Sequence, residues 1–391
     1  MKQGWEYKKL GEVCTIERGG SPRPITDYIT DSEDGINWIK IGDAQEGSKY
    51  ITSTKEKIRL EGLKKSRFVH KGDFILSNSM SFGRPYILKV DGCIHDGWLV
   101  IHDDKEVFIK DYLYYILSSP IMYAKFSQLA VGGVVNNLNS SLVRKVTIPL
   151  PPKSTQLSIV SELDKINELI RLKKEQLKDY DNLAQSIFYE MFGDPVENEK
   201  GWEVKKLGEV CSQITDGTHN SPTNTKNGDF KYVTAKNIKK EGIVLDNITY
   251  VDADTHHSIY SRCNPEYGDI LYIKDGATTG IATINNLNEE FSLLSSVALL
   301  KLEDKIINYY LKAVLNTPSL YNCIRTNMGG AAITRLTLVK IKAIKIPLPP
   351  LPLQHLFAQR IEHIERQKSA VQKSITDLET LLASRMQYWF E

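Results

Sequence analysis

The sequence predicts an α+β protein with two pseudo-symmetric strand-rich domains that are separated by a pair of long antiparallel coiled-coil helices. Three observations predict this. The chain repeats itself at an offset of 197 residues, its composition changes at the same place in each copy, and each copy ends in a long heptad pattern. A period of this length is too long for a solenoid, so each copy is expected to fold as a domain.

The repeat is clearest in two motifs. Ten of eleven positions are identical between residues 4–14 and 201–211, and an Ile-Pro-Leu-Pro-Pro run occurs at 148–152 and again at 346–350. These motifs predict the domain boundaries: a first domain at 1–152, a central long helix at 153–195, a second domain at 196–350, and a C-terminal long helix at 351–391 that pairs with the central helix.

Before the proline runs, each copy has the composition of a mixed, strand-rich domain. Short β-branched and aromatic runs, broken by Gly, Asn and Ser, predict strands at 35–41, 73–76, 98–101, 232–234 and 269–273. Helical patterns interrupt them at 110–118 and 306–315. We expect these helices to end near Pro120 and Pro318, because proline breaks a helix interior.

After the prolines, apolar residues recur in alternating steps of four and three, which average 3.5 and predict a coiled-coil seam. Its apolar members include Ile159, Leu163, Ile166, Ile170, Leu177, Ile187, Phe357, Ile361, Ile364, Val371, Ile375, Leu378 and Leu382. One lysine interrupts each seam, Lys173 and Lys368. A helix from 154 to about 192 spans roughly 58 Å. If the second helix runs back beside it, the two domains face the same way, as a reader of two DNA half-sites requires.

Composition excludes several classes of protein. The 391 residues carry Lys+Arg 50 against Asp+Glu 48, a formal charge of +2 that neither demands nor forbids nucleic acid. Five scattered cysteines without a CxxC pair are expected to be reduced and mostly buried, not zinc ligands. No apolar run approaches the roughly 20 residues of a spanning helix, and the N-terminus has no signal-peptide core, so we expect a cytoplasmic protein without a membrane partner.

Motifs of catalysis are missing from the sequence. It has no GxxxxGK[ST], HExxH or GxSxG, and no GxGxxG that opens a helix. The run 193–196, Gly-Asp-Pro-Val, lacks the second proline and the aromatic residue of an amino-methyltransferase loop. His256 and His257 have no other ligand at metal spacing, so we expect them in a solvated loop. The chain is therefore expected not to be an enzyme and to hold no metal.

The order of these features resembles the specificity subunit of type I restriction-modification systems over the whole chain. It runs from the strand-rich domain through Ile-Pro-Leu-Pro-Pro to a heptad helix that ends in Phe-Gly-Asp-Pro at 192–195, and Gly-Trp-Glu-x-Lys-Lys-Leu-Gly-Glu-Val then restarts the cycle. The resemblance implies two target-recognition domains, each reading half of a bipartite double-stranded DNA site. It also implies two modification (methyltransferase) subunits that carry S-adenosylmethionine and methylate adenine, and restriction (endonuclease) subunits that cleave with ATP and Mg, so this chain needs no cofactor.

Residues that are identical in both copies cannot distinguish two half-sites, so the residues that differ in matched loops are the candidate readers. Arg suits guanine and Asn suits adenine in the major groove, although each loop could also be an ordinary solvated turn. The candidates are Arg18, Ser21 and Arg23 against Thr218, His219 and Asn220; Asn78, Ser79 and Arg84 against Lys274, Asp275, Thr278 and Thr279; and Asn136 and Asn137 against Arg335.

Copy one also carries a basic segment at 55–71, with seven basic residues against two acidic ones; Lys64, Lys65 and Arg67 are its candidate phosphate contacts. Copy two lacks such a segment, so the first domain is expected to hold the DNA backbone more strongly. Two alternatives remain. The chain could be the specificity partner of a fused methylase-nuclease, or a coiled-coil scaffold that binds proteins and not DNA.

Overall fold

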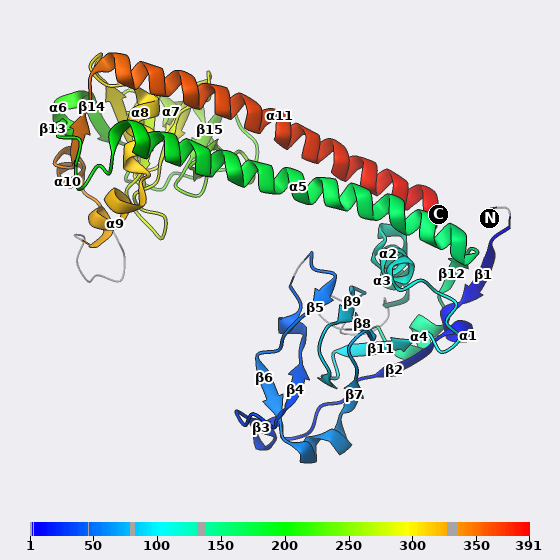
Figure 1. The fold of residues 1–391 in the computed structure, drawn as a ribbon. Coiled ribbons are helices and arrows are strands. Elements are labelled where there is room, and N and C mark those ends of the chain that lie inside the picture. The colour runs from blue at the N-terminus through cyan, green and yellow to red at the C-terminus, as the bar shows by residue number, and fades with distance from the viewer. Residues whose placement is uncertain (1, 3, 46, 79–82, 131–137, 327–334) are drawn as a thin grey trace. The chain divides into compact units, whose positions relative to one another are not determined.

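The computed structural model describes the chain except residues 1, 3, 46, 79–82, 131–137 and 327–334. It divides into two compact units: unit 1 comprises 1–174 and 373–391, and unit 2 comprises 175–372. Each unit therefore contains one strand-rich repeat and one part of each long helix, α5 (Lys153–Phe192) and α11 (Leu351–Phe390). Figure 1 labels these elements.

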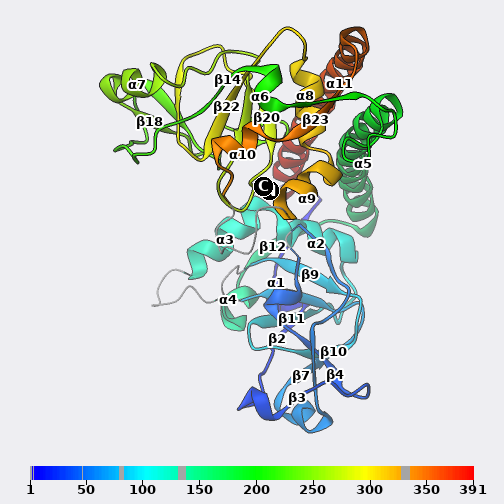
Figure 2. The ribbon, with the colours of Figure 1, turned by 90° about the vertical axis from the view of Figure 1, so that its left-hand side faces the viewer.

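Unit 1 is built on two five-stranded sheets, ordered β2-β11-β8-β9-β5 and β3-β6-β4-β10-β7. Figure 2 shows the first sheet between the second sheet and the helices α2 and α3. The strands are β2 (Thr15–Arg18), β3 (Ile29–Thr30), β4 (Ile36–Ile39), β5 (Tyr50–Ile51), β6 (Glu56–Ile58), β7 (Arg67–Val69), β8 (Phe74–Ser77), β9 (Pro85–Leu88), β10 (Gly92–Ile94) and β11 (Trp98–His102). The short helices are α1 (Leu10–Val13), α2 (Lys110–Ser118), α3 (Pro120–Ala130) and α4 (Ser140–Arg144), with 3-10 turns η1 (Ile25–Asp27), η2 (Ile41–Asp43) and η3 (Leu60–Lys65).

Unit 2 repeats this plan with a four-stranded sheet, β14-β22-β19-β20, a three-stranded sheet, β18-β15-β21, and a hairpin, β16-β17. The strands are β14 (Cys211–Asp216), β15 (Phe230–Val233), β16 (Ile238–Lys239), β17 (Gly242–Ile243), β18 (Thr249–Val251), β19 (Ile270–Ile273), β20 (Ala282–Ile284), β21 (Phe291–Leu293) and β22 (Val297–Leu302). The helices are α6 (Leu207–Val210), α7 (Ala253–Tyr260), α8 (Asn308–Leu315), α9 (Pro318–Thr326) and α10 (Leu338–Lys342).

The two prolines that were expected only to end helices each begin another one. Helix α2 covers the predicted 110–118, but Pro120 is the first residue of α3, and Pro318 is the first residue of α9. Proline suits this position because the first N–H groups of a helix have no partner inside the helix, so the missing donor costs nothing.

The two repeated sequence motifs lie against each other in each unit. Strand β1 (Glu6–Lys9) is antiparallel to β12 (Thr147–Leu150), and β13 (Glu203–Lys206) is antiparallel to β23 (Lys345–Leu348). A buried leucine follows each first strand, Leu10 and Leu207. The two motifs recur together in each repeat because they pair with each other as one two-stranded antiparallel ribbon.

A buried glutamine joins each ribbon to the long helix that follows it. The side-chain oxygen of Gln156 accepts from Ile109 N at 2.8 Å, and that of Gln354 accepts from Ile307 N at 2.9 Å. The amide nitrogens donate to pairs of backbone carbonyls at 2.8 to 3.3 Å. Each amide is thus fully hydrogen-bonded where it is buried, which is the condition for tolerating a polar group in a core.

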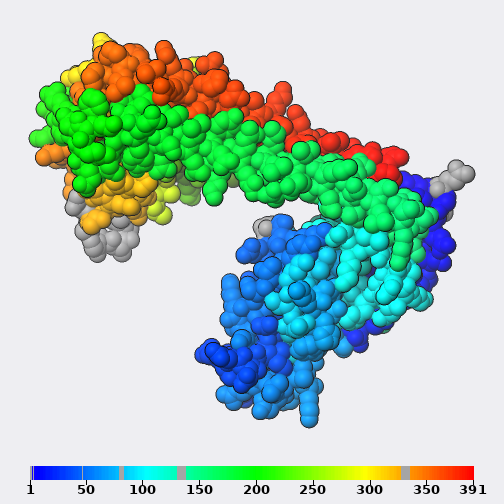
Figure 3. Space-filling view, in the orientation of Figure 1, coloured from blue at the N-terminus to red at the C-terminus, as the bar shows by residue number. Residues whose placement is uncertain are grey.

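The long helices pair antiparallel along their apolar seam. In unit 1, Glu162 near the start of α5 forms an ion pair with Arg385 near the end of α11. In unit 2, Asp181 of α5 lies 2.7 Å from Lys368 of α11, so this lysine in the seam has a partner. Figure 3 shows the two helices in contact. All thirteen apolar residues predicted for the seam are buried or half-buried. None of the helices, over the residues that the structure describes, is apolar enough to cross a membrane.

We predict that Gln354→Ala lowers the free energy of unfolding by about 1–3 kcal/mol, because it leaves a buried backbone N–H and two carbonyls without their partner. Urea denaturation of the full chain measures this. Gln156→Ala should give a loss of similar size, and Gln367→Ala, at an exposed position of α11, is the control. A loss no larger than that of the control would contradict the assigned role.

Candidate nucleic-acid interface

Each unit holds its first predicted reading loop tightly against the neighbouring strand connection. A Cβ added to Gly19 would lie 2.3 Å from the carbonyl oxygen of His95, and one added to Gly217 would lie 1.9 Å from that of Leu293. Neither position has room for a side chain. The backbone of the two loops is therefore packed in the same way where each loop follows its strand. The loops differ in the side chains that come after this glycine.

In unit 1 the loop side chains gather around Asp96. The Ser21 hydroxyl donates to its carboxylate at 2.8 Å, and the guanidinium groups of Arg23 and Arg18 lie at 3.5 and 4.0 Å. The Asn78 amide donates to the Asp96 backbone carbonyl at 3.0 Å. We call this group, with His95, the Asp96 cluster. The side chains of Arg18 and Arg23 are 52% and 82% exposed, and Arg18 Nε donates to the Asp96 backbone carbonyl at 2.9 Å.

The hydrogen bonds of His95 define its tautomer. Gly97 N–H donates to Nδ1 at 2.9 Å, so Nε2 carries the proton and donates to the Asp96 carboxylate at 3.0 Å. Burial lowers the pKa of His95, which favours the neutral ring. Burial alone would raise the pKa of Asp96, but the Ser21 hydrogen bond and the nearby His95, Arg18 and Arg23 outweigh it and hold that pKa below its usual value.

In unit 2 the central carboxylate is Asp216, which is buried at the end of β14. Lys274 Nζ, Arg262 Nη1 and His219 Nε2 each lie 3.3 Å from it. Lys274 also lies 3.1 Å from Asp275, which in turn lies 3.3 Å from Arg335. We call these six residues the Asp216 cluster. The structure thus brings together residues from all three predicted reading segments of this repeat.

The two clusters occupy the same backbone frame. Asn78 N donates to the carbonyl of Gly97, and Lys274 N donates to that of Ser296, both at 2.9 Å. Asn78 and Lys274 are therefore matched positions. The frame is shared between the units, whereas the charges differ: unit 1 places exposed arginines around a partly exposed aspartate, and unit 2 surrounds a buried aspartate with three basic groups.

The other candidates differ in how accessible they are. Arg84, Asn220, Thr278, Lys64 and Lys65 are exposed, and Thr218 is half-buried. Lys65 Nζ lies 2.5 Å from the Tyr28 hydroxyl.

Three candidates have their polar groups bound within the protein. The Arg67 guanidinium binds Glu17 at 2.7 Å and the Arg18 carbonyl at 2.9 Å. Lys274 is buried in its ion pairs, and Thr279 is buried with its hydroxyl donating to Gly276 O at 2.7 Å. Ser79, Asn136 and Asn137 lie outside the described residues.

The expectation of a solvated loop is wrong for His256. It lies on α7, is buried, stacks on Phe230 at 3.7 Å and contacts the Ser292 hydroxyl at 3.1 Å. Asp252 caps this helix by accepting from Thr255 N, and an Asp before a helical run is a signal that could have found it. Within the described part of the chain, no group of three His, Cys, Asp or Glu side chains could hold a metal ion.

The family profile for the type I restriction modification DNA specificity domain matches residues 2–179 and 199–380, that is, both repeats. The chain belongs to this family. The type I DNA specificity family is one of recognition subunits, and membership confirms the main interpretation while supporting neither the fused-enzyme nor the scaffold alternative.

Relatives of the family align over nearly the whole chain. The type I restriction enzyme MjaIX specificity subunit of Methanocaldococcus jannaschii is 23% identical, over 97% of this chain and 91% of its own length. A chain from a solved structure of a type I R-M system has a TM-score of 0.65 at 20% identity and covers 99% of this chain and 97% of its own. The type I S subunit from M. genitalium has a TM-score of 0.53 at 15% identity, with 100% and 98% covered. These structures confirm the predicted architecture of two strand-rich domains with two long helices.

We predict that unit 1 loses stability as the pH falls from 7.5 to 5.0. The folded-state pKa of His95 lies below its unfolded value of about 6.5, so the unfolded state binds a proton first. The stability that the neutral His95 ring contributes is fully present above a pH of about 6.5. It is lost as the pH falls through the folded-state pKa of His95. Asp96 also makes the folded state less stable as the pH falls, because its folded-state pKa is lowered too, but this loss occurs at lower pH.

Urea unfolding followed by tryptophan fluorescence measures this effect. His95→Asn places an amide oxygen near the position of Nδ1, where it can accept from Gly97 N, and does not titrate, so its stability should change less between the two pH values. His257→Gln, at an exposed position of unit 2, is the control. An equal pH dependence of wild type and His95→Asn would refute the assignment.

Proposed function

We propose that each unit reads one half of a bipartite double-stranded DNA target, unit 1 through the Asp96 cluster and unit 2 through the Asp216 cluster. The observation that carries the proposal is that the two clusters stand on one backbone frame and differ in their side chains. A duplicated scaffold with different polar groups at matched places is what two different half-sites require. We retain the domain boundaries given above, 1–152, 153–195, 196–350 and 351–391, as part of this proposal.

The Asp96 cluster has the donors for direct readout. Arg18 and Arg23 expose guanidinium groups that can bind guanine O6 and N7 in pairs. Asp96 holds both groups and Ser21 in one orientation, so less side-chain freedom is lost when DNA binds. The same carboxylate would repel phosphate that approached it directly, which favours base edges over the backbone at this point.

In unit 2 the buried and the exposed polar residues have different proposed roles. Its buried pair, Asp216 and Lys274, holds the loops together and does not present donors to a ligand. The exposed members of the reading segments, His219, Asn220, Thr278 and Arg335, are the contacts that we propose for DNA. An asparagine suits adenine in the major groove, and an arginine suits guanine.

We further propose that this chain works in the cytoplasm within a larger complex. Two modification subunits would supply S-adenosylmethionine and adenine methylation, and restriction subunits would supply cleavage with ATP and Mg. The paired helices α5 and α11 are the proposed docking elements, because they carry exposed faces along 40 residues each. In this proposal the chain contributes specificity and no catalytic residue.

Exchange of residues 1–150 for those of a relative tests the function directly. We expect one half of the methylated motif to change and the other half to stay, because the two clusters lie in separate units. Methylation mapping of DNA from cells that express the complete system measures both halves at once. The reciprocal exchange of the second repeat is the control. Changes in both halves from either exchange would refute independent reading.

The basic segment of unit 1 generates a separate prediction. Replacing Lys64 and Lys65 by alanine should weaken binding to all duplexes equally and reduce the slope of log affinity against log salt by about 2, because each lost phosphate contact removes about 0.9. Gel shifts of the complex with its methyltransferase at several salt concentrations measure this. Lys200→Ala, at an exposed position outside both long helices and both clusters, is the control. An unchanged slope would show that this segment is only a solvated face.

A further inference from the structure

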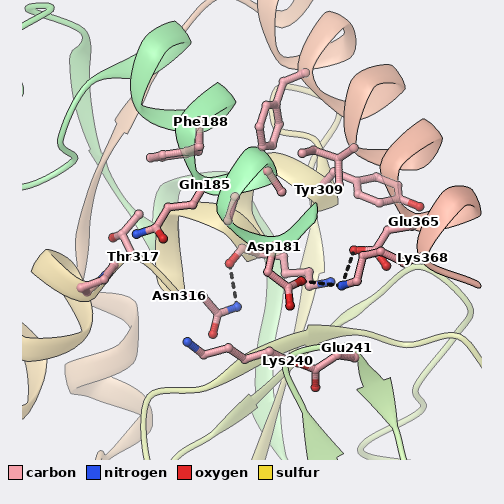
Figure 4. A pocket seen from close by; sticks show the side chains of 16 residues that line it. Asp181, Gln185, Phe188, Lys240, Glu241, Tyr309, Asn316, Thr317, Glu365 and Lys368 are labelled. Carbon is pink, nitrogen blue, oxygen red and sulfur yellow. Dashed lines mark hydrogen bonds and ion pairs between the residues drawn. The ribbon is translucent and has the colours of Figure 1, made fainter. Parts of the chain in front are cut away.

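A pocket in unit 2 lies where α8 packs against the long helices (Figure 4). Its volume is about 380 Å³, and Phe188, Phe357 and Ile361 form part of its apolar wall. Six charged side chains line it, three of each sign, and they are Lys240, Lys312, Lys368, Asp181, Glu241 and Glu365. It belongs to neither of the clusters described above, so DNA reading does not account for it.

Two of the three ammonium groups that line this pocket have no ion pair with the described residues: Lys240, which is exposed, and Lys312, which is half-buried. Lys368 is paired, because its Nζ lies 2.7 Å from Asp181 and 3.6 Å from Glu365. Lys312 of α8 has no side-chain hydrogen bond or ion pair with the described residues, and burial lowers its pKa. The pocket therefore combines an apolar wall with a cation and with a carboxylate, Glu365.

The other repeat shows which group suits this place. Helices α2 and α8 occupy corresponding places in the two repeats. The Tyr112 and Tyr310 hydroxyls donate to the carbonyls of Pro149 and Pro347 at 2.8 and 2.7 Å, so these two tyrosines are matched positions. On this frame the position of Ala313 in unit 2 corresponds to a tyrosine, Tyr115, in unit 1.

In unit 1 the aromatic ring of Tyr115 is buried, and its hydroxyl is bound on both sides. It donates to Asp164 at 2.5 Å and accepts from the Asn167 amide at 3.1 Å. Lys49 Nζ lies 5.4 Å from the ring centroid, within the range of a cation–π contact. Asn167 matches Glu365 of unit 2, since Gln156 and Gln354 fix the same offset of 198.

Unit 2 thus has alanine where the ring of unit 1 begins, and at the matched positions around it Lys312 stands for Tyr114 and Glu365 stands for Asn167. We propose that this pocket binds a tyrosine side chain of a partner chain. The ring would pack on Phe188 and Phe357 beside the Lys312 ammonium, and its hydroxyl would donate to Glu365. A partner that uses the pocket contacts the second repeat at a place where the first repeat supplies its own tyrosine, so it distinguishes the two repeats.

Saturation-transfer NMR on the full chain with N-acetyl-tyrosinamide tests the proposal. We expect transfer to the ring protons, a weaker signal from the phenylalanine amide, and none from the leucine amide. Ala313→Tyr, which restores the residue of unit 1, should abolish the tyrosinamide signal. Gln367→Ala, at an exposed position of α11, should leave it unchanged. Equal signals from the tyrosine and leucine amides, or a full signal in folded Ala313→Tyr, would overturn the proposal.

Three further measurements separate the remaining explanations. Thermal melting establishes that Ala313→Tyr is folded; if it is not, Lys312→Tyr replaces it with the same expected loss.

Tyr115→Ala should open a second tyrosinamide site in unit 1, and no added signal from this folded variant would count against the proposal. A pentapeptide with a central tyrosine between glycines should bind as the amide does. Binding of the free amide alone would indicate a small-molecule site and refute a partner chain.

Discussion

The structure depends on the burial of one apolar seam. Two helices of 40 residues each carry a stripe that neither can leave in water, and each buries it against the other in antiparallel orientation. Because both helices contribute to both units, the first repeat is not complete without residues 373–391. The polar positions in the seam follow the same constraint, since Lys368 is tolerated there with Asp181 beside it.

Duplication separates the contacts that both repeats share from the groups that differ between them. The glutamine amides, the tyrosine hydroxyls on proline carbonyls and the tight glycines are the same in both units, because each satisfies a backbone requirement that both repeats share. The groups around Asp96 and Asp216 obey no such requirement, and there the repeats diverge. Divergence on a constant frame is what the proposed reading of two different half-sites requires.

Much of the fold could be predicted from the sequence, because it follows from periodicity and repetition. The seam, the position of α2 and the two-repeat plan are local or internal patterns. The site was only partly predictable. Loops containing Arg18, Ser21 and Arg23 could be named from the differences between repeats, but Asp96, which organises them, follows a strand far along the chain. Likewise, the burial of Lys274 depends on its pairing with Asp216, which no spacing reveals. His256 was misplaced because its helix is short and its stacking partner, Phe230, is distant in sequence.

The last turn of α11 belongs to the core of the first repeat. Phe390 is buried there against Tyr112, and Trp389 stacks on Trp5 at 6.3 Å. Unit 2, by contrast, is one continuous stretch of chain. During synthesis the second repeat therefore has all its residues before the first one does, and the N-terminal repeat lacks part of its core until Phe390 has been made. Loss of Trp389 and Phe390 would accordingly damage the half of the protein that was made first.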